Sequence, residues 1–110
     1  MQSRLKSGFW VAAYLRRLQL NDIPVYVVSH GDDDAGAVLV KANTLDGLAK
    51  LYQRSYTLNG TREWLELASG PDRDVEEAIA RQRNFDPDIW VLEVEDRDGR
   101  TLLDEDGLSG

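Results

Sequence analysis

Phe85-Asp86-Pro87-Asp88-Ile89-Trp90-Val91-Leu92-Glu93-Val94-Glu95-Asp96 is the stretch that turns a helix into a strand in the C-terminal half of the chain. Pro87 cannot continue a helix, so the preceding helix ends before it. The next strand is predicted from Ile89 to Glu95, and its glutamates alternate with apolar residues. The apolar members are Trp90, Leu92 and Val94. This alternation indicates a strand with one buried face and one solvated face.

The first helix is predicted from Ser7 to Leu20 because its apolar residues recur at helical spacing. The residues that share its main stripe are Trp10, Val11, Tyr14, Leu15 and Leu18. The opposite side of this helix is also partly apolar, and such a helix is usually covered on more than one face. We therefore expect its outer side to be covered by the N-terminal segment around Leu5 or by a second subunit.

Turn signals between the two helices separate four predicted strands, at residues 23–29, 37–42, 49–58 and 61–68. Asn59-Gly60, between the last two strands, is typical of a tight hairpin because both residues tolerate a positive φ. The first strand contains the run Val25-Tyr26-Val27-Val28, which has little polar alternation. Such a run predicts a central strand that is buried on both faces.

The second helix follows Ser69-Gly70-Pro71, where the sheet is predicted to break. Asp74 as the N-cap and Glu77 three residues later form a capping-box pattern. The predicted order is therefore helix, four strands, helix and strand. Hairpin-linked strands flanked by helices predict an α+β fold with two layers, an antiparallel four-strand meander plus a fifth strand, and both helices on one sheet face.

A single domain accounts for the 110 residues and is expected to span residues 1–103. Residues 104–110 are acidic and contain Gly and Ser, so we expect a frayed tail there. The chain has no cysteine, which excludes disulfides and thiolate chemistry. It shows no secretory signal and no apolar stretch long enough to span a bilayer, so the expected location is the cytoplasm.

The net charge of −7 is unevenly distributed along the chain. Residues 1–55 hold seven Lys/Arg and five Asp/Glu, giving +2, whereas residues 56–110 hold six and fifteen, giving −9. An acidic half repels the phosphate backbone of nucleic acids. The charge therefore disfavours non-specific nucleic-acid binding.

One candidate metal site is an acidic loop formed by His30, Asp32, Asp33 and Asp34. Carboxylate oxygens are the ligands that Mg²⁺ and Ca²⁺ prefer, so this loop could serve a divalent cation in an enzyme. The simpler interpretation is an acidic turn, because the chain has one histidine and short matches of this kind are often accidental. We assign no metal ligand, cofactor or catalytic residue on this basis.

A calcium-loop pattern also begins at Val94 and ends at Glu105, but Val94 occupies a ligand position and cannot coordinate. A hairpin turn at Asp98-Gly99 explains the same residues. Glu93 and Glu95 lie roughly 7 Å apart by strand rise, a separation that could frame glycoside hydrolysis. We interpret these two acids as a charged outer face instead.

The third strand carries a pattern that could bind single-stranded nucleic acid, because aromatic and basic residues alternate with other residues along it. The residues on this face are Lys50, Tyr52, Arg54 and Tyr56. Tyrosine and arginine suit a half-buried sheet surface equally well, and the acidity of the chain favours that structural interpretation.

The last candidate group lies at the end of the second helix and consists of Arg81, Arg83, Asp86 and Asp88. These residues could bind a partner, or they could form ion pairs with each other near the helix end. The structural pairing is the simpler interpretation, although Asp86 and Asp88 flank Pro87 without an obvious structural need.

Several motifs together resemble a small bacterial family, domain-of-unknown-function family 1491, which is found mainly in alphaproteobacteria. The motifs are Arg4-Leu5-Lys6-Ser7-Gly8, Trp10-Val11, Leu15-Arg16-Arg17, Gly31-Asp32, Asp34-Ala35-Gly36-Ala37-Val38, Arg81-Gln82-Arg83, Phe85-Asp86-Pro87-Asp88, Trp90-Val91 and Glu95-Asp96-Arg97-Asp98-Gly99. The block from Arg81 to Gly99 is the most specific part of the resemblance, which covers nearly the whole chain. It implies a stand-alone cytoplasmic protein and carries no activity, cofactor or site residue.

The sequence thus favours a small non-enzymatic protein that acts through protein–protein binding or self-association. The first helix, apolar on more than one side, is the expected surface of a homodimer. A divalent-metal or small-ligand enzyme using His30, Asp32 and Asp34 is one alternative hypothesis. Single-stranded nucleic-acid binding is the other.

Overall fold

The computed structural model describes residues 6–56 and 62–105 of the chain. The elements follow the predicted order of helix, four strands, helix and strand. They are α1 (Ser7–Leu20), β1 (Val25–Ser29), β2 (Val38–Asn43), β3 (Leu48–Tyr56), β4 (Arg62–Pro71), α2 (Asp72–Phe85) and β5 (Trp90–Glu95). The bounds of α1 match the prediction, and the α+β class is confirmed.

The five strands form one mixed sheet with the order β1-β5-β2-β3-β4. Strand β5 lies between β1 and β2, antiparallel to β1 and parallel to β2. The expected four-strand meander is therefore wrong for its first strand, and only β2, β3 and β4 form a meander. Strand β5 can lie between β1 and β2 because α2 carries the chain across one face of the sheet before β5 begins. A helical crossing of this kind is what allows β5 to run parallel to β2.

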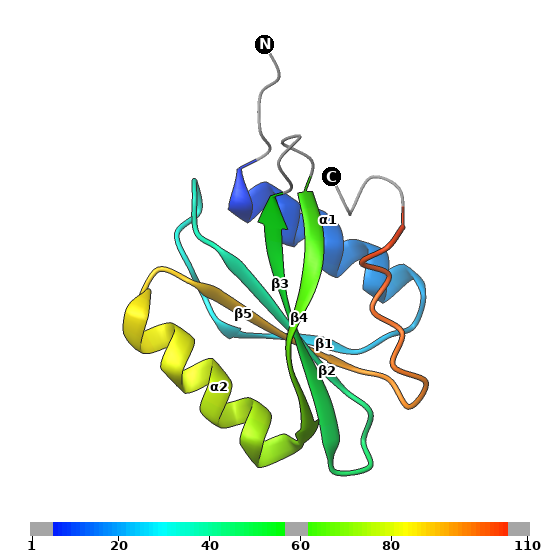
Figure 1. The fold of residues 1–110 in the computed structure, drawn as a ribbon. Helices are drawn as coiled ribbons and strands as arrows, with labels where there is room; N and C mark the ends of the chain where they lie inside the picture. Colours follow the sequence, from blue (N-terminus) through cyan, green and yellow to red (C-terminus); the bar gives the residue numbers. More distant parts are fainter. Residues whose placement is uncertain (1–5, 57–61, 106–110) are drawn as a thin grey trace.

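The two helices cover opposite faces of the sheet, so the molecule has three layers (Figure 1). The expectation that both helices share one face is wrong. The reason lies in β2 and β5, where residues at successive positions are buried on both sides of the sheet. The buried residues on the α1 side include Trp10, Tyr14, Val40 and Leu92, and those on the α2 side include Leu39, Leu51, Ile79 and Val91.

One flank of α1 is covered by the segment that follows β5. The Tyr14 hydroxyl donates a hydrogen bond of 2.7 Å to the carbonyl of Thr101, and Arg17 forms a 2.9 Å ion pair with Glu105. Leu103 is buried in the same core. Part of the broad apolar surface of α1 is therefore buried within the chain itself, while Phe9 and Leu20 stay exposed.

The boundary between β4 and α2 differs from the predicted one. Strand β4 continues through Gly70, which has a φ of +137°, to Pro71, and α2 begins at once at Asp72. The predicted capping box is wrong because Asp74 already lies in the first turn, and the N-cap residue Pro71 makes no side-chain cap. The predicted hairpin turn at Asn59-Gly60 lies outside the described residues.

Neither helix in the described ranges is long and apolar enough to cross a membrane.

Candidate interaction site at the free edge of β1

Strand β1 lies at one edge of the sheet, where β5 is its sole neighbour among the described strands. Its apolar residues are largely exposed: 54% for Tyr26, 43% for Val27 and 52% for Val28. The prediction that this strand is central and buried on both faces is therefore wrong. The apolar run is present, but the described part of the chain does not bury it, and an exposed apolar edge is a surface on which another strand can pair.

The outer edge of β1 presents two main-chain donors and two acceptors. The N–H of Glu95 donates a 2.9 Å hydrogen bond to the carbonyl of Pro24, and Val25 lies opposite Val94. Antiparallel strands alternate between bonded and non-bonded pairs, so the main-chain groups of Tyr26 point toward β5. The N–H and C=O groups of Val25 and Val27 consequently point away from the sheet.

Charge distinguishes this edge from the opposite edge at β4. Residues 23–29 contain no charged side chain, whereas β4 carries Glu63 and Glu66 and ends at Pro71. Charges and proline on an edge strand discourage pairing with a further strand. Of the two sheet edges, β1 is therefore the one open to an added strand.

Each edge strand also contains an irregularity in its register. The register shifts at Val28 in β1 and at Leu67 in β4, so each of these residues is an extra residue in its strand. A bulge locally ends regular pairing. In β1 the regular part is therefore the segment from Val25 to Val27, which holds all four outward main-chain groups.

The Tyr26 side chain lies beside acidic residues of β5. Glu95, which accepts a hydrogen bond from the Tyr26 hydroxyl, raises the pKa of this phenol above its ordinary value, and Glu93 acts in the same direction. Tyr26 lies opposite Glu93 in the strand register. The acidic groups beside Tyr26 thus lie one strand inward, on β5.

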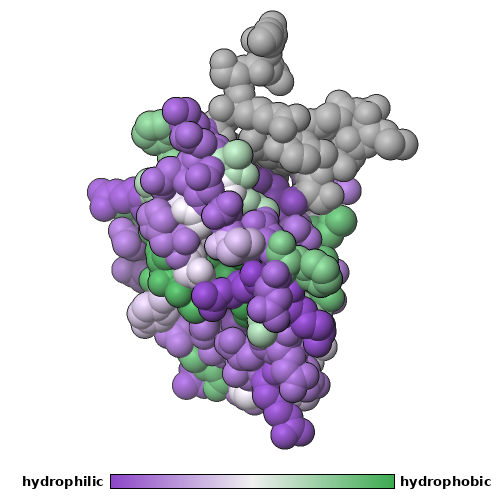
Figure 2. Space-filling view, turned by 90° about the vertical axis from the view of Figure 1, so that its left-hand side faces the viewer, coloured by the Kyte–Doolittle hydropathy of each residue, from purple (hydrophilic) through white to green (hydrophobic). Residues whose placement is uncertain are grey.

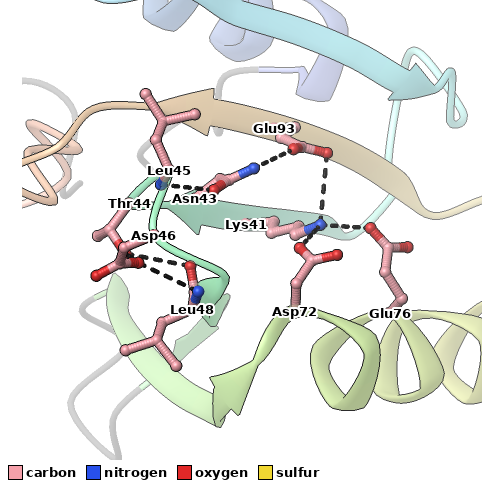
Figure 3. Close-up of polar contacts among 9 residues, drawn as sticks. All are labelled: Lys41, Asn43, Thr44, Leu45, Asp46, Leu48, Asp72, Glu76 and Glu93. Atoms are coloured by element: carbon pink, nitrogen blue, oxygen red, sulfur yellow. Dashed lines mark hydrogen bonds and ion pairs between the residues drawn. The ribbon is translucent and has the colours of Figure 1, made fainter.

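Two strands inward from the β1 edge, the buried Lys41 of β2 forms ion pairs that join the sheet to α2 (Figure 3). The Nζ of Lys41 lies 2.6 Å from a carboxylate oxygen of Asp72 and 3.6 Å from one of Glu93, and it also contacts Glu76. Its side chain is 3% exposed, whereas the three carboxylates reach solvent to different extents. Lys41 on β2 thereby joins β5 to the first turns of α2.

Two opposing effects set the pKa of Lys41. Burial lowers it, but the hydrogen bonds to Asp72 and Glu76 and the charge of Glu93 outweigh burial, so the net pKa is raised. The lysine therefore stays protonated, and it acts as a fixed cation rather than as a base or a nucleophile. Asn43 completes the arrangement by donating a 3.0 Å hydrogen bond to Glu93.

The predicted outer-face role of Glu93 is therefore wrong, because this carboxylate faces Lys41 and Asn43 beneath α2. Glu93 and Glu95, the candidate pair for glycoside hydrolysis, have separate partners, since Glu95 accepts a hydrogen bond from the Tyr26 hydroxyl. Sequence reasoning missed Lys41 as well. Lys41 lies within the otherwise apolar run Val38-Leu39-Val40-Lys41-Ala42, and a lysine inside such a strand is a signal that could have identified it as a covered cation.

The acidic loop considered as a candidate metal site, residues 30–34, is stabilised by hydrogen bonds within its own turn. Asp32 accepts hydrogen bonds from the N–H groups of Asp34 and Ala35, at 3.2 and 2.8 Å, and His30 pairs with Asp33 at 3.1 Å. Across the residues whose placement is described, no group of three or more His, Asp or Glu side chains is arranged to hold a metal ion. The two main-chain hydrogen bonds that the Asp32 carboxylate accepts are those of an acidic turn.

The same loop is held against the start of β5 by two hydrogen bonds of the Asp32 main chain. The indole N–H of Trp90 donates a 2.9 Å hydrogen bond to the carbonyl of Asp32, and the N–H of Asp32 donates one of 2.9 Å to the carbonyl of Asp88. A Cβ atom at Gly31 would lie about 2.5 Å from the Asp88 carbonyl oxygen, so the close approach requires glycine. These contacts fix the chain just after β1.

The calcium-loop residues form a turn after β5. Arg100 contacts both carboxylate oxygens of Asp96, at distances from 2.9 to 3.3 Å, and the N–H of Gly99 bonds the Asp96 carbonyl. These hydrogen bonds from Arg100 lower the pKa of Asp96. Val94, in the first ligand position, is buried in the core.

The face proposed for single-stranded nucleic acid lies against α1. Tyr52 packs on the core beneath α1, and the guanidinium of Arg54 lies 5.1 Å from the ring centre of Trp10. Lys50 forms a 3.8 Å ion pair with Glu66, and the side chain of Tyr56 is outside the described set. The described aromatic and basic groups are therefore engaged within the fold.

The four candidate interaction residues near Pro87 are not joined by ion pairs. Arg81 and Arg83 are exposed on α2. The carboxylate of Asp86 accepts a 3.0 Å hydrogen bond from the N–H of Asp88, and the carbonyl of Asp88 bonds Asp32. The carboxylate of Asp86 thus has a structural role in the turn into β5, which the sequence did not indicate, whereas Asp88 contributes through its main chain.

A pocket of about 690 Å³ lies on the α1 side of the sheet, between β3, β4 and the segment after β5. Tyr52, Trp64 and Leu102 contribute to its walls, as does Arg100, which is already paired with Asp96.

The face of the molecule seen in Figure 2, turned by 90° from the view of Figure 1, is mostly hydrophilic and has separated apolar areas. The exposed apolar residues therefore do not merge into one broad patch on that face.

Comparison with solved structures gives close matches over most of the chain. A crystal structure of a DUF1491 family protein from Caulobacter crescentus CB15 is 41% identical, with a TM-score of 0.86, and the match covers 93% of this chain and 97% of that one. An NMR structure of a DUF1491 family protein from Caulobacter crescentus CB15 is 40% identical over 94% and 96% of the two chains, with a TM-score of 0.83. The solution structure of protein Atu0922 from A. tumefaciens is 28% identical over 84% and 86%, with a TM-score of 0.73.

No curated protein matches the chain. The family model described as "Protein of unknown function (DUF1491)" matches residues 5–104, nearly the whole sequence. The resemblance inferred from the sequence motifs is confirmed by this match and by the two Caulobacter structures. The chain belongs to the DUF1491 family of proteins of unknown function.

Proposed function

We propose that the protein acts through protein–protein binding, by accepting an extended segment of protein as an added strand along β1. The observation that carries this proposal is an uncharged apolar strand at the sheet edge, with the main-chain groups of Val25 and Val27 directed outward. Main-chain hydrogen bonds provide affinity in strand addition, and side chains on alternate faces provide specificity.

The rest of the fold supports this proposal by holding β1 in place. Strand β5, its neighbour, is buried between β1 and β2 and is tied to α2 through Glu93 and Lys41. The loop after β1 is fixed by the contacts of Asp32 with Asp88 and Trp90. A rigid edge loses little conformational freedom when a strand is added, which favours binding.

Selection from a phage library of short random peptides tests the proposal. The selected peptides should bind along β1 and change the amide NMR signals of Val25, Tyr26 and Val27 most strongly. Val27→Pro removes one outward N–H without touching the pairing with β5, and it should weaken peptide binding roughly tenfold. Val27→Lys, which places a charge on the edge, is a second variant in case the proline disturbs folding.

Leu65→Ser is the matched control, because Leu65 is a similarly exposed apolar residue on the other edge strand, β4. It should leave peptide binding unchanged. Selected peptides that perturb a different surface, or that bind both β1 variants as tightly as the parent chain, would show that the proposed function is wrong.

We also propose that this binding takes place in the cytoplasm. The absence of cysteine is compatible with a reducing compartment, and it supports the location that the family resemblance implied. Cell fractionation with a tagged chain is the measurement that tests the location.

A further inference from the structure

We infer that the strand added to β1 is β1 of a second copy of this chain, paired antiparallel about a two-fold axis at Tyr26. This inference rests on the proposed function and names its partner. In this register Val25 pairs with Val27 of the second copy, and Val27 pairs with its Val25. Each bonded pair of antiparallel residues exchanges two hydrogen bonds, so all outward groups of both valines are satisfied.

Three features of β1 fit this register. Tyr26 lies on the axis in a non-bonded pair, where the two side chains approach most closely and two aromatic rings can pack. Pro24 meets Val28 of the second copy in another non-bonded pair, where the missing N–H of proline is not needed. The irregularity at Val28 therefore lies outside the bonded pairs.

The neighbouring registers lose hydrogen bonds. An axis at Val25 would require a bond from the N–H of Ile23, which already donates a 3.0 Å hydrogen bond to Leu18. An axis at Val27 would pair Val25 with Ser29, which lies beyond the irregularity. A two-fold axis placed between two adjacent residues of β1 would pair a residue whose main-chain groups point outward with one whose groups point toward β5. Such a pair cannot form its hydrogen bonds. The register centred on Tyr26 is the one that the edge can satisfy.

Charge explains why a second copy can approach although each chain carries −7. Residues 23–29 carry no charge, so no like-charged side chains meet across the strand pair. Glu93 and Glu95 lie one strand inward in each copy, and their repulsion acts at a distance that salt screens effectively. We therefore expect added salt to strengthen the dimer.

The dimer would be a continuous ten-stranded sheet with both α1 helices on one face, because the two-fold axis of such a pair is perpendicular to the sheet. A strand pair this short buries less than the roughly 800 Å² per partner of a standard interface. We therefore expect a dissociation constant in the range of about 10–100 µM.

Analytical ultracentrifugation of the full chain over a concentration series tests the inference. The parent chain should shift from monomer to dimer as the concentration passes through that range, and the shift should move to lower concentration in higher salt. Val27→Pro and Val27→Lys should stay monomeric, whereas Leu65→Ser should dimerise like the parent chain.

Cross-linking tests the register itself, because the chain contains no cysteine. Tyr26→Cys places two thiols in a non-bonded pair, whose Cα atoms lie about 4.5 Å apart, within the range that suits a disulfide. Oxidised glutathione accepts the two electrons and two protons that the thiols release. Tyr26→Cys should form a covalent dimer, whereas Val28→Cys and Leu65→Cys should remain mostly monomeric.

The outcomes separate this inference from the proposed function. A parent chain that stays monomeric throughout, yet binds selected peptides along β1, refutes the self-pairing and leaves strand addition intact. A dimer that persists in Val27→Pro and Val27→Lys refutes the self-pairing too, and it points to another surface such as the outer side of α1. A monomer without peptide binding refutes both.

Discussion

Among the described residues, Lys41 is the one on which most of the ionic contacts of the α2 side depend. It brings Asp72 and Glu76 of α2 and Glu93 of β5 around one buried ammonium group. The three acids repel each other without it, and Glu93 is the least exposed of them. The lysine thus converts an acidic cluster into a contact that holds a helix to the sheet.

Lys41→Met should lower the free energy of unfolding by about 2 kcal/mol, less than for a fully buried pair because the carboxylates reach solvent. Urea unfolding followed by circular dichroism measures this loss. Lys50→Met is the matched control, since its 3.8 Å pair with Glu66 is exposed, and it should change stability by less than about 0.5 kcal/mol. Equal effects of the two substitutions would contradict a special role of Lys41.

At the scale of elements, the loop between β1 and β2 depends on a close approach to the start of β5. Gly31→Ala should destabilise the protein by about 2 kcal/mol, because a Cβ there meets main-chain atoms of Asp88 and Trp90. Ala35→Ser in the same exposed loop should have an effect below about 0.5 kcal/mol. Thermal unfolding of the two variants measures the difference, and a stability of Gly31→Ala equal to that of the parent would show that the approach is looser than described.

The order and nature of the elements could be predicted because they depend on local patterns. The spacing of Trp10, Tyr14 and Leu18 predicts α1, and Pro87 predicts the end of α2. The position of a strand in the sheet depends on pairing between distant segments, which local patterns do not encode. Placing β5 beside β1 and β2, and α2 on the second face, therefore required the structure.

Strand β1 shows this limit most clearly. Its apolar residues indicate burial on both faces, and a sequence cannot show whether the covering surface comes from the same chain or from another. The structure leaves Tyr26, Val27 and Val28 largely exposed at the edge. A buried-strand composition at an exposed position is typical of a surface that another chain covers, and β1 has this combination.

For the whole molecule, stability at alkaline pH should reflect two buried groups, Tyr14 and Lys41, that keep their protons in the fold. Burial raises the pKa of Tyr14 above its usual range, and the acids around Lys41 raise the pKa of that lysine despite its burial. The unfolded chain releases these protons at ordinary pKa values of about 10 to 10.5, whereas the folded chain retains them. Stability should therefore be fully present below about pH 10 and fall as the pH rises further.

Urea unfolding at a series of pH values between neutral and strongly alkaline measures this fall. Each such group should contribute a slope of up to about 1.4 kcal/mol per pH unit. Tyr14→Phe should lower stability near neutral pH by about 1 kcal/mol, because the hydrogen bond to Thr101 is lost, and it should also make the alkaline fall shallower. An unchanged slope in Tyr14→Phe would mean that this phenol ionises in the folded protein, and that the segment covering α1 opens before the core unfolds.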